Sequence, residues 1–185
     1  LGKTENPTMY IENQFGSMNP HENLSPKEST EIIRSHVTDG IKLAKKFKIP
    51  EVVYRGILEH HGDGVLRYFY EMEKSVNPYV EKNEFRHLGS KPTTKETSIL
   101  MFADSLEGAC RARFLNEDAD EAKIKEVVEE IFKEKISDGQ LDQSPITFED
   151  LNLIKESFQK SLEGLYHQRV MYPDITEDEE EQEEE

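Results

Sequence analysis

The sequence is poor in cysteine and in long apolar stretches, and each shortage excludes a class of protein. The only cysteine, Cys110, cannot form an internal disulfide, which fits a reducing compartment. The longest unbroken apolar run covers residues 99–103, far short of the roughly 20 residues that span a bilayer. No secretory signal is visible at the start of the chain.

Basic charge is also scarce. The chain carries 39 acidic and 23 basic residues, for a formal net charge of −16, and residues 174–185 hold nine acids and no base, which leaves −7 for residues 1–173. This balance excludes non-specific binding of duplex nucleic acid, because such binding needs a basic face that displaces counterions. If the substrate is an anion, a bound metal is the usual means of attracting it.

The composition divides the chain into two parts. Residues 1–173 are long enough for one domain of ordinary size, and residues 174–185 are predicted to be a disordered, solvated acidic tail. The chain begins with Leu1 and not with Met. We therefore expect it to be a piece of a longer protein.

Capping signals and periodicity predict an all-α domain. Ser25 and Glu28 form a capping box with Pro26 at the first helical position, and Pro50 ends this helix by residue 49. Further helices are expected at residues 51–61, 64–76, 93–115, 119–137 and 147–171. The third of these is opened by a capping box at Thr93, and the last is capped by residues 147–150. Residues 1–25 and 77–92 are predicted to be long irregular loops. Strand-like alternation is scarce, which favours a helical bundle.

Polar residues interrupt the apolar faces of these helices. His36 lies in the apolar stripe of its helix, the pair His60-His61 ends the next one, and Asp104 follows the longest apolar run. Adjacent helical residues diverge by about 100°, so the pair reaches two ions more easily than it chelates one. Together, three imidazoles and a carboxylate on inward faces favour a metal centre of iron, manganese or zinc.

Each of these residues also has a structural interpretation when it is taken alone. A single histidine on an apolar face is more often a hydrogen-bonded core residue, and a histidine pair suits a helix C-terminus. Asp104 can form a salt bridge with Arg111 or Arg113. Only the combination favours a metal.

Read in order, these residues resemble the HD phosphohydrolases, an all-α superfamily with the metal-binding series His…His-Asp…His…His-His…Asp. His36, His60-His61 and Asp104 match the later half of that series, and Leu1-Gly2-Lys3 matches the end of a His-Asp-x-Gly-Lys motif. Further segments resemble the bacterial branch of membrane-anchored, seven-transmembrane HD phosphodiesterases that cleave cyclic di-AMP: Tyr10-Ile11-Glu12-Asn13-Gln14, Asn19-Pro20-His21, Leu24-Ser25-Pro26, Tyr68-Phe69-Tyr70 and Phe85-Arg86. The glycine-tyrosine-proline signature of the cyclic di-GMP branch is absent from the sequence.

The resemblance implies a fold, a reaction and a location. It implies an HD-domain helical bundle in which His36, His60, His61 and Asp104 hold two divalent ions, iron or manganese. A metal-activated water would then hydrolyse cyclic di-AMP to the linear dinucleotide pApA, with Lys3 as a catalytic residue near the phosphate. It further implies a cytoplasmic domain of a bacterial membrane protein, and it places the family's His-Asp pair directly before Leu1.

The residues that would bind the substrate are less sharply defined. Arg111 is a candidate for the second phosphate, although a salt bridge with Glu107 explains it as well. Tyr68, Tyr70 and Arg86 are candidates for contacting adenine, although aromatic residues at this spacing are more often core. Two other functions stay open, which are hydrolysis of another nucleotide and a degenerate HD module that binds a nucleotide without turnover.

Overall fold

The computed structural model describes residues 1–10, 19–114 and 119–167. Within these ranges every regular element is a helix, apart from one isolated antiparallel bridge between Val65 and Arg86. The predicted all-α class is therefore confirmed. The predicted acidic tail and the segment Glu12-Asn13-Gln14 lie outside the described residues.

The helices follow one another with short connections. The α-helices are α1 (Pro26–Lys46), α2 (Glu51–Glu59), α3 (Arg67–Val76), α4 (Lys95–Arg113), α5 (Glu121–Ser137) and α6 (Phe148–His167). The two segments expected to be irregular contain short 3₁₀ helices, which are η1 (Gly2–Glu5), η2 (Pro7–Met9), η4 (Pro20–Asn23) and η5 (Lys82–Phe85). None of the described helices is long and apolar enough to cross a membrane.

Two predicted capping boxes are present and one is displaced. Ser25 Oγ accepts the Glu28 amide while Glu28 accepts the Ser25 amide at 2.8 Å, and Thr147 and Asp150 exchange the equivalent bonds. The N-cap of α4 is Thr94 and not Thr93 as predicted. The reason is tertiary, because the Thr93 hydroxyl already donates to a carboxylate of α2.

The start of α3 also differs from the prediction. The helix begins at Arg67 and not near Gly64, because the preceding residues pair with the segment after η5. Leu66 N donates to Phe85 O at 2.7 Å, next to the bridge between Val65 and Arg86. This extended pairing holds residues 64–66 out of the helix.

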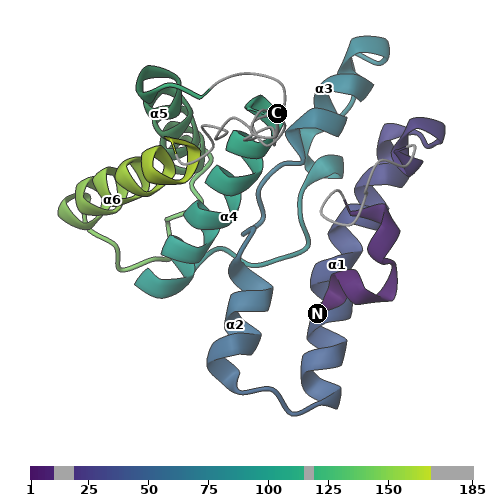
Figure 1. Cartoon of the computed structure of the whole chain (residues 1–185). Coiled ribbons are helices and arrows are strands. Elements are labelled where there is room, and N and C mark those ends of the chain that lie inside the picture. Colours follow the sequence, from purple (N-terminus) through teal and green to yellow (C-terminus); the bar gives the residue numbers. More distant parts are fainter. Residues whose placement is uncertain (11–18, 115–118, 168–185) are drawn as a thin grey trace, which may run out of the picture.

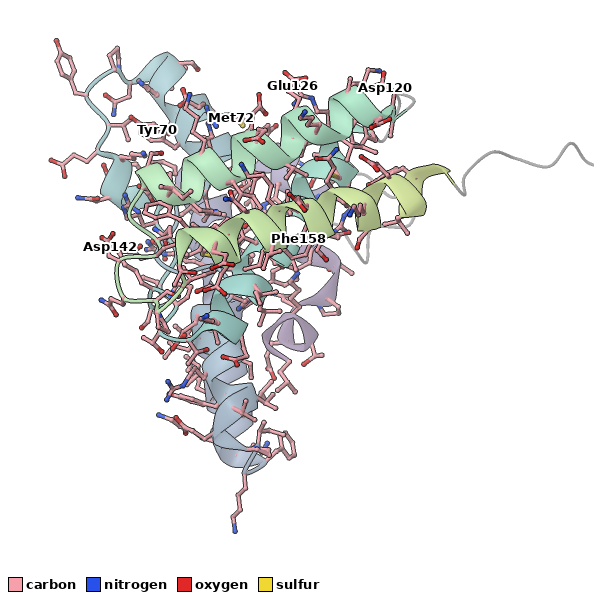
Figure 2. All side chains as sticks on the ribbon, turned by 90° about the vertical axis from the view of Figure 1, so that its left-hand side faces the viewer. Tyr70, Met72, Asp120, Glu126, Asp142 and Phe158 are labelled. Atoms are coloured by element: carbon pink, nitrogen blue, oxygen red, sulfur yellow. The ribbon has the colours of Figure 1, made fainter. Side chains whose placement is uncertain are left out.

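The apolar core lies between α4, α5 and α6, which pack together on one side of the molecule (Figure 1). Figure 2 shows α5 and α6 side by side, with Phe158 on α6. The buried members of this core are Met101, Phe102, Leu106, Cys110, Phe114, Ile124, Val127, Val128, Phe132, Leu151 and Leu162. Burying these side chains is the main source of stability.

The other side of the molecule is built around α1. This helix packs against α2, α3 and η1, and α2 in turn packs against α4. Gly2 touches the backbone of α1 so closely that a Cβ atom on it would lie 1.7 Å from His36 O. Only glycine fits at this position, and its lack of a side chain lets η1 pack directly against the backbone at His36. Lys3, the next residue, is therefore held close to His36.

Candidate metal centre

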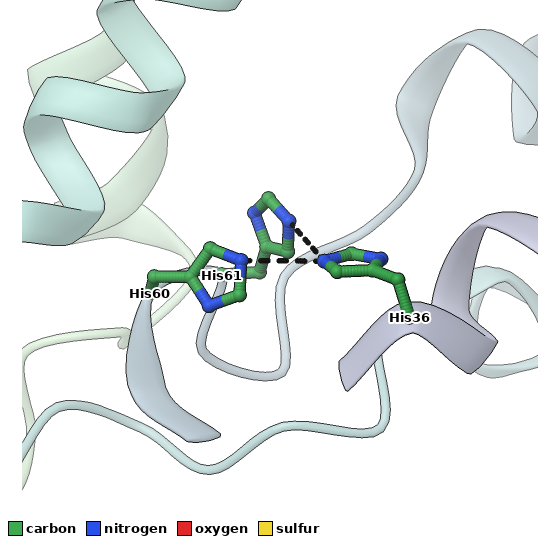
Figure 3. Close-up of side chains that lie close together, drawn as sticks. All are labelled: His36, His60 and His61. Carbon is green, nitrogen blue, oxygen red and sulfur yellow. Dashed lines mark hydrogen bonds between the residues drawn. The ribbon is translucent and has the colours of Figure 1, made fainter. Parts of the chain in front are cut away.

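Three imidazoles converge between the middle of α1 and the C-terminal end of α2. His36 comes from the middle of α1, whereas His60 and His61 directly follow the last residue of α2. The Nε2 atom of His36 lies 3.2 Å from His60 Nε2 and 3.1 Å from His61 Nε2 (Figure 3). One possible ligand atom from each of these three histidines lies within 4.8 Å of the other two, and among the described residues no other group of three or more His, Cys, Asp or Glu residues does this.

The second nitrogen of each ring fixes its tautomer. Nδ1 of His36 lies 2.5 Å from Ile33 O, and Nδ1 of His60 lies 2.9 Å from Ile57 O. A carbonyl oxygen only accepts hydrogen bonds, so each Nδ1 must carry the proton and donate it. Nδ1 of His61 lies 3.0 Å from Asp104 Oδ2 and donates in the same way.

In the neutral form of the three rings, the Nε2 atoms therefore carry no proton. Their lone pairs face one another at hydrogen-bonding distance with no proton between them, which is unfavourable in the protein alone. The same arrangement, with each ring oriented by a carbonyl or carboxylate behind it, is typical of imidazoles that bind a metal. The residues present therefore fit a divalent cation.

The electrostatics of the cluster favour neutral rings next to a charged carboxylate. Burial lowers the pKa of His36 and of His60 to about 4. Burial alone would raise the pKa of Asp104, but the hydrogen bond from His61 lowers it to about 2. At neutral pH the two rings are free to bind a cation and Asp104 is negatively charged.

A fourth histidine, which the sequence did not single out, lies beside the cluster. The ring of His87 stacks on that of His61, with centroids 4.2 Å apart and an interplanar angle of 22°. Its amide donates to Gly64 O at 2.9 Å, which holds the loop after η5 at this place. Burial lowers the pKa of His87 to about 2. A lone histidine in a loop has no periodicity that could have indicated this position.

His36, His61 and His87 line a cleft of about 710 Å³, whereas His60 is absent from its lining. Its lining includes the polar residues His36, His61, His87 and Asp104 and the apolar or aromatic residues Tyr68, Phe69, Met72, Met9 and Leu24. Lys3 and Arg111 also line it. The charge of Lys3 helps to lower the pKa of both His36 and Asp104, so its ammonium group acts on the histidine cluster.

The structure separates the predicted substrate-binding residues into two groups. Tyr68 and Arg111 line the cleft, and Arg111 is paired with Glu107 as the alternative interpretation expected. Tyr70 is absent from the lining and packs on Phe85, with ring centroids 5.9 Å apart. Since Tyr70 is two residues beyond Tyr68 on α3, it points about 200° away around the helix.

Arg86 also lies outside the lining of the cleft. Its guanidinium group donates to both carboxylate oxygens of Asp138, at 2.8 and 2.9 Å, and to Asp63 O at 2.7 Å. The hydrogen bond to Asp138 is also the main reason that the pKa of Arg86 is raised. The structure thus makes Arg86 a clamp between the loop after α2 and the end of α5.

Comparison with known proteins agrees with this geometry. The family model described as HD domain matches residues 12–109. The cyclic-di-AMP phosphodiesterase PgpH of Listeria monocytogenes serotype 1/2a (strain 10403S) is 38% identical over 174 residues, which are 94% of this chain and 24% of that protein. The PgpH protein of Bacillus subtilis (strain 168) is 37% identical over 176 residues, or 95% of this chain and 24% of that protein.

A solved structure extends the comparison to three dimensions. The crystal structure of the L. monocytogenes PgpH HD domain in complex with cyclic-di-AMP matches with a TM-score of 0.84 and 37% sequence identity, covering 89% of this chain and 76% of that one. The chain spans about a quarter of the length of the curated relatives it matches. From its sequence, its fold and its histidine cluster, the chain belongs to the HD domain family, and its HD domain is similar to that of PgpH.

Proposed function

We propose that this chain is the catalytic domain of a metal-dependent phosphodiesterase that hydrolyses cyclic di-AMP to linear pApA. The observation that carries the proposal is the convergence of three imidazole Nε2 atoms at the edge of a cleft, with His36 Nε2 3.2 Å from that of His60 and 3.1 Å from that of His61. The names of the two PgpH relatives and of the solved complex support the choice of substrate. The proposed location is the cytoplasmic side of a bacterial membrane-anchored protein.

The proposed ligands are His36, His60, His61 and Asp104, which would hold two divalent ions. Imidazole and carboxylate donors suit iron or manganese and do not select the ions that thiolates prefer. When bound, such ions supply a water of lowered pKa as the nucleophile and neutralise charge on the phosphate. Asp104 has a second task, because its contact with Nδ1 of His61 keeps the Nε2 of that ring directed at the other two.

Two cations of the chain would complete the phosphate site. Gly2 fixes η1 against α1, which holds Lys3 in the lining of the cleft with the histidines. From there its ammonium group would stabilise charge that develops on the phosphate oxygens. Arg111 lies on the same helix as Asp104 and would face the second phosphate, with Glu107 holding its guanidinium group in place.

The apolar wall of the cleft would hold the bases. Tyr68 and Phe69 present aromatic rings to the cleft, and Met72 follows Tyr68 by one helical turn. Flat aromatic side chains stack on nucleobases at a gain of about 1–3 kcal/mol per base. This wall takes the place of Tyr70 and Arg86, which the sequence suggested for the same role.

The proposal is tested by a hydrolysis assay. The protein is incubated with cyclic di-AMP and Mn²⁺, both as the 185-residue chain and in its native full-length form. We expect linear pApA, resolved by chromatography, and its loss when the metal is chelated. No product with Mn²⁺, Fe²⁺ or Zn²⁺ would contradict the proposal. Turnover of a different nucleotide, or binding without turnover, would favour one of the two other functions.

A further inference from the structure

Glu59 is a buried acidic residue that is absent from the lining of the cleft. It is the last residue of α2 and only 4% of it is exposed to solvent. One carboxylate oxygen accepts hydrogen bonds from Thr93 N at 2.8 Å and from Thr97 Oγ1 at 2.6 Å, and the other accepts from Thr93 Oγ1 at 2.9 Å. All three donors belong to the start of α4 and the residues before it.

These bonds join α2 and α4, which are two of the three helices that position the proposed metal ligands. Glu59 directly precedes His60 and His61 in the chain. Thr97 precedes Asp104 by seven residues, which is about two turns, so both side chains lie on the same face of α4. One carboxylate therefore connects the histidine pair to the helix face from which Asp104 reaches Nδ1 of His61.

We propose that Glu59 is a positioning residue that sets the position of Asp104 relative to the pair His60-His61. In this role it determines the orientation of the His61 ring and, through it, the affinity of the centre for divalent cations. The part of the proposal that concerns metal affinity rests on the proposed function, whereas the part that concerns ring orientation does not.

The chemistry of the contact requires a carboxylate. Both oxygens act only as acceptors, and all the groups that face them are donors. A glutamine oxygen could replace the carboxylate oxygen that faces Thr93 N and Thr97 Oγ1, but its NH₂ group would then face Thr93 Oγ1, and the Thr93 hydroxyl would have to accept instead of donate. A negative charge is also favourable beside the N-terminus of a helix, where the backbone amides of α4 begin.

Neighbouring contacts show that this junction is built around Glu59. Arg55 donates to Thr93 Oγ1 at 3.1 Å, and Ser90 N donates to Leu58 O at 3.1 Å. Thr94 takes over the capping of α4, which leaves the Thr93 hydroxyl for Glu59. The displacement of the cap by one residue, which local sequence rules do not predict, follows from this use of Thr93.

The test compares Glu59→Gln with Glu51→Gln, which makes the same chemical change on the same helix. The side chain of Glu51 is 78% exposed and its nearest ion-pair contact, with Arg55, is 3.8 Å long. We measure the dissociation constant for Mn²⁺ in the folded 185-residue chain, well below the unfolding transition, and the absorption spectrum with Co²⁺. Glu59→Gln should weaken binding about tenfold to a hundredfold and change the Co²⁺ spectrum, as loss of a group behind a metal ligand does. Glu51→Gln should stay within about twofold, as expected for an exposed pair.

Two further variants approach the contact from α4. Thr97→Val removes the hydroxyl that donates to Glu59 and should also weaken Mn²⁺ binding, whereas Thr97→Ser keeps the hydroxyl and should restore it. If Glu59→Gln does not fold, this pair gives the result. A purely structural role would lower the unfolding temperature of both Glu59→Gln and Thr97→Val and leave the metal affinity of the folded protein unchanged, which would overturn the proposal.

A measurement on the metal-free protein separates this proposal from the proposed function. The ring nitrogen signals of His61, followed by ¹⁵N NMR, should move in Glu59→Gln and stay in place in Glu51→Gln. If the unaltered chain bound no divalent cation, the proposed function would fail, and the His61 signals would still decide the role of Glu59. Unchanged His61 signals in Glu59→Gln would contradict the proposed positioning role of Glu59.

Discussion

The two halves of the molecule bury different kinds of side chain. Between α4, α5 and α6 the interior is apolar, and the rings of Phe102 and Phe132 stack with centroids 4.1 Å apart. Around α1 and α2 the buried residues include the polar Ser29, His36 and Glu59. Since α4 contributes to both halves, one of its faces supplies the core and another supplies Asp104 and Arg111 to the cleft. Stability and chemistry are therefore largely separated, and substitutions should separate them too.

The largest effect on stability is expected in the apolar half. Phe132→Ala removes a fully buried ring from the stack with Phe102 and should lower the free energy of unfolding by about 3–5 kcal/mol. Urea unfolding followed by circular dichroism measures this loss. The Mn²⁺ affinity of the remaining folded protein should not change. A large drop in that affinity, measured below the transition, would mean that the two halves are not separated.

The largest effect on metal binding is expected in the polar half. His60→Ala removes one of the three converging Nε2 atoms, so the purified protein should lose its metal and its hydrolytic activity while its helicity stays largely intact. Elemental analysis and circular dichroism measure both properties on one sample. Full metal occupancy in this variant would show that His60 is not a ligand.

A smaller effect on stability is expected at Arg86, which lies outside the lining of the cleft. Arg86→Gln breaks the paired hydrogen bonds to Asp138 and should cost about 1–3 kcal/mol of stability, with the KM for cyclic di-AMP unchanged. Thermal unfolding and steady-state kinetics give the two values. The opposite result, a raised KM at unaltered stability, would restore Arg86 to the substrate site that the sequence suggested.

The pH dependence of the metal-free protein tests the burial of the histidines. The pKa of His36 and of His60 is lowered by burial from 6.5 to about 4, so between these values the unfolded chain binds more protons than the folded one. The free energy of unfolding should therefore fall as the pH drops from 6.5 toward 4, by about 1.4 kcal/mol per pH unit for each ring. Urea titrations in the presence of a chelator measure this slope. His36→Gln should reduce it, and an equal slope in that variant would contradict the assignment.

The smallest effect is expected at the exposed cation of the cleft. Arg111→Gln removes an ion pair with Glu107 on the surface of α4, which is worth about 0–1 kcal/mol of stability. We expect the KM for cyclic di-AMP to rise and kcat to change little. Unchanged kinetics would leave the salt bridge as the whole role of Arg111.

The features that could be predicted from the sequence are those with local causes. The caps at Ser25 and Thr147 depend on residues three positions apart, and both are present. The convergence of His36 with His60 and His61 was indicated by their positions on apolar helix faces. Residue spacing could not predict that Asp104 contacts Nδ1 of His61, outside the group formed by the three Nε2 atoms.

The features that could not be predicted depend on distant partners. Thr93 does not cap α4, because it binds Glu59, which lies 34 residues earlier in the chain. Arg86 does not line the cleft, because it binds Asp138, which lies 52 residues later. His87 reaches the cluster through a loop whose path is set by contacts with residues 64–66. No periodicity or motif in the sequence encodes such pairings.

The most direct test of the metal centre follows the ring nitrogens of His36, His60 and His61 by ¹⁵N NMR at neutral pH. In the metal-free protein, the account predicts a proton on each Nδ1 and none on Nε2. On titration with Zn²⁺, a diamagnetic substitute for iron or manganese, the three Nε2 signals should move together and saturate. Protonated Nε2 atoms, or Nε2 signals that stay in place at saturating Zn²⁺, would contradict it.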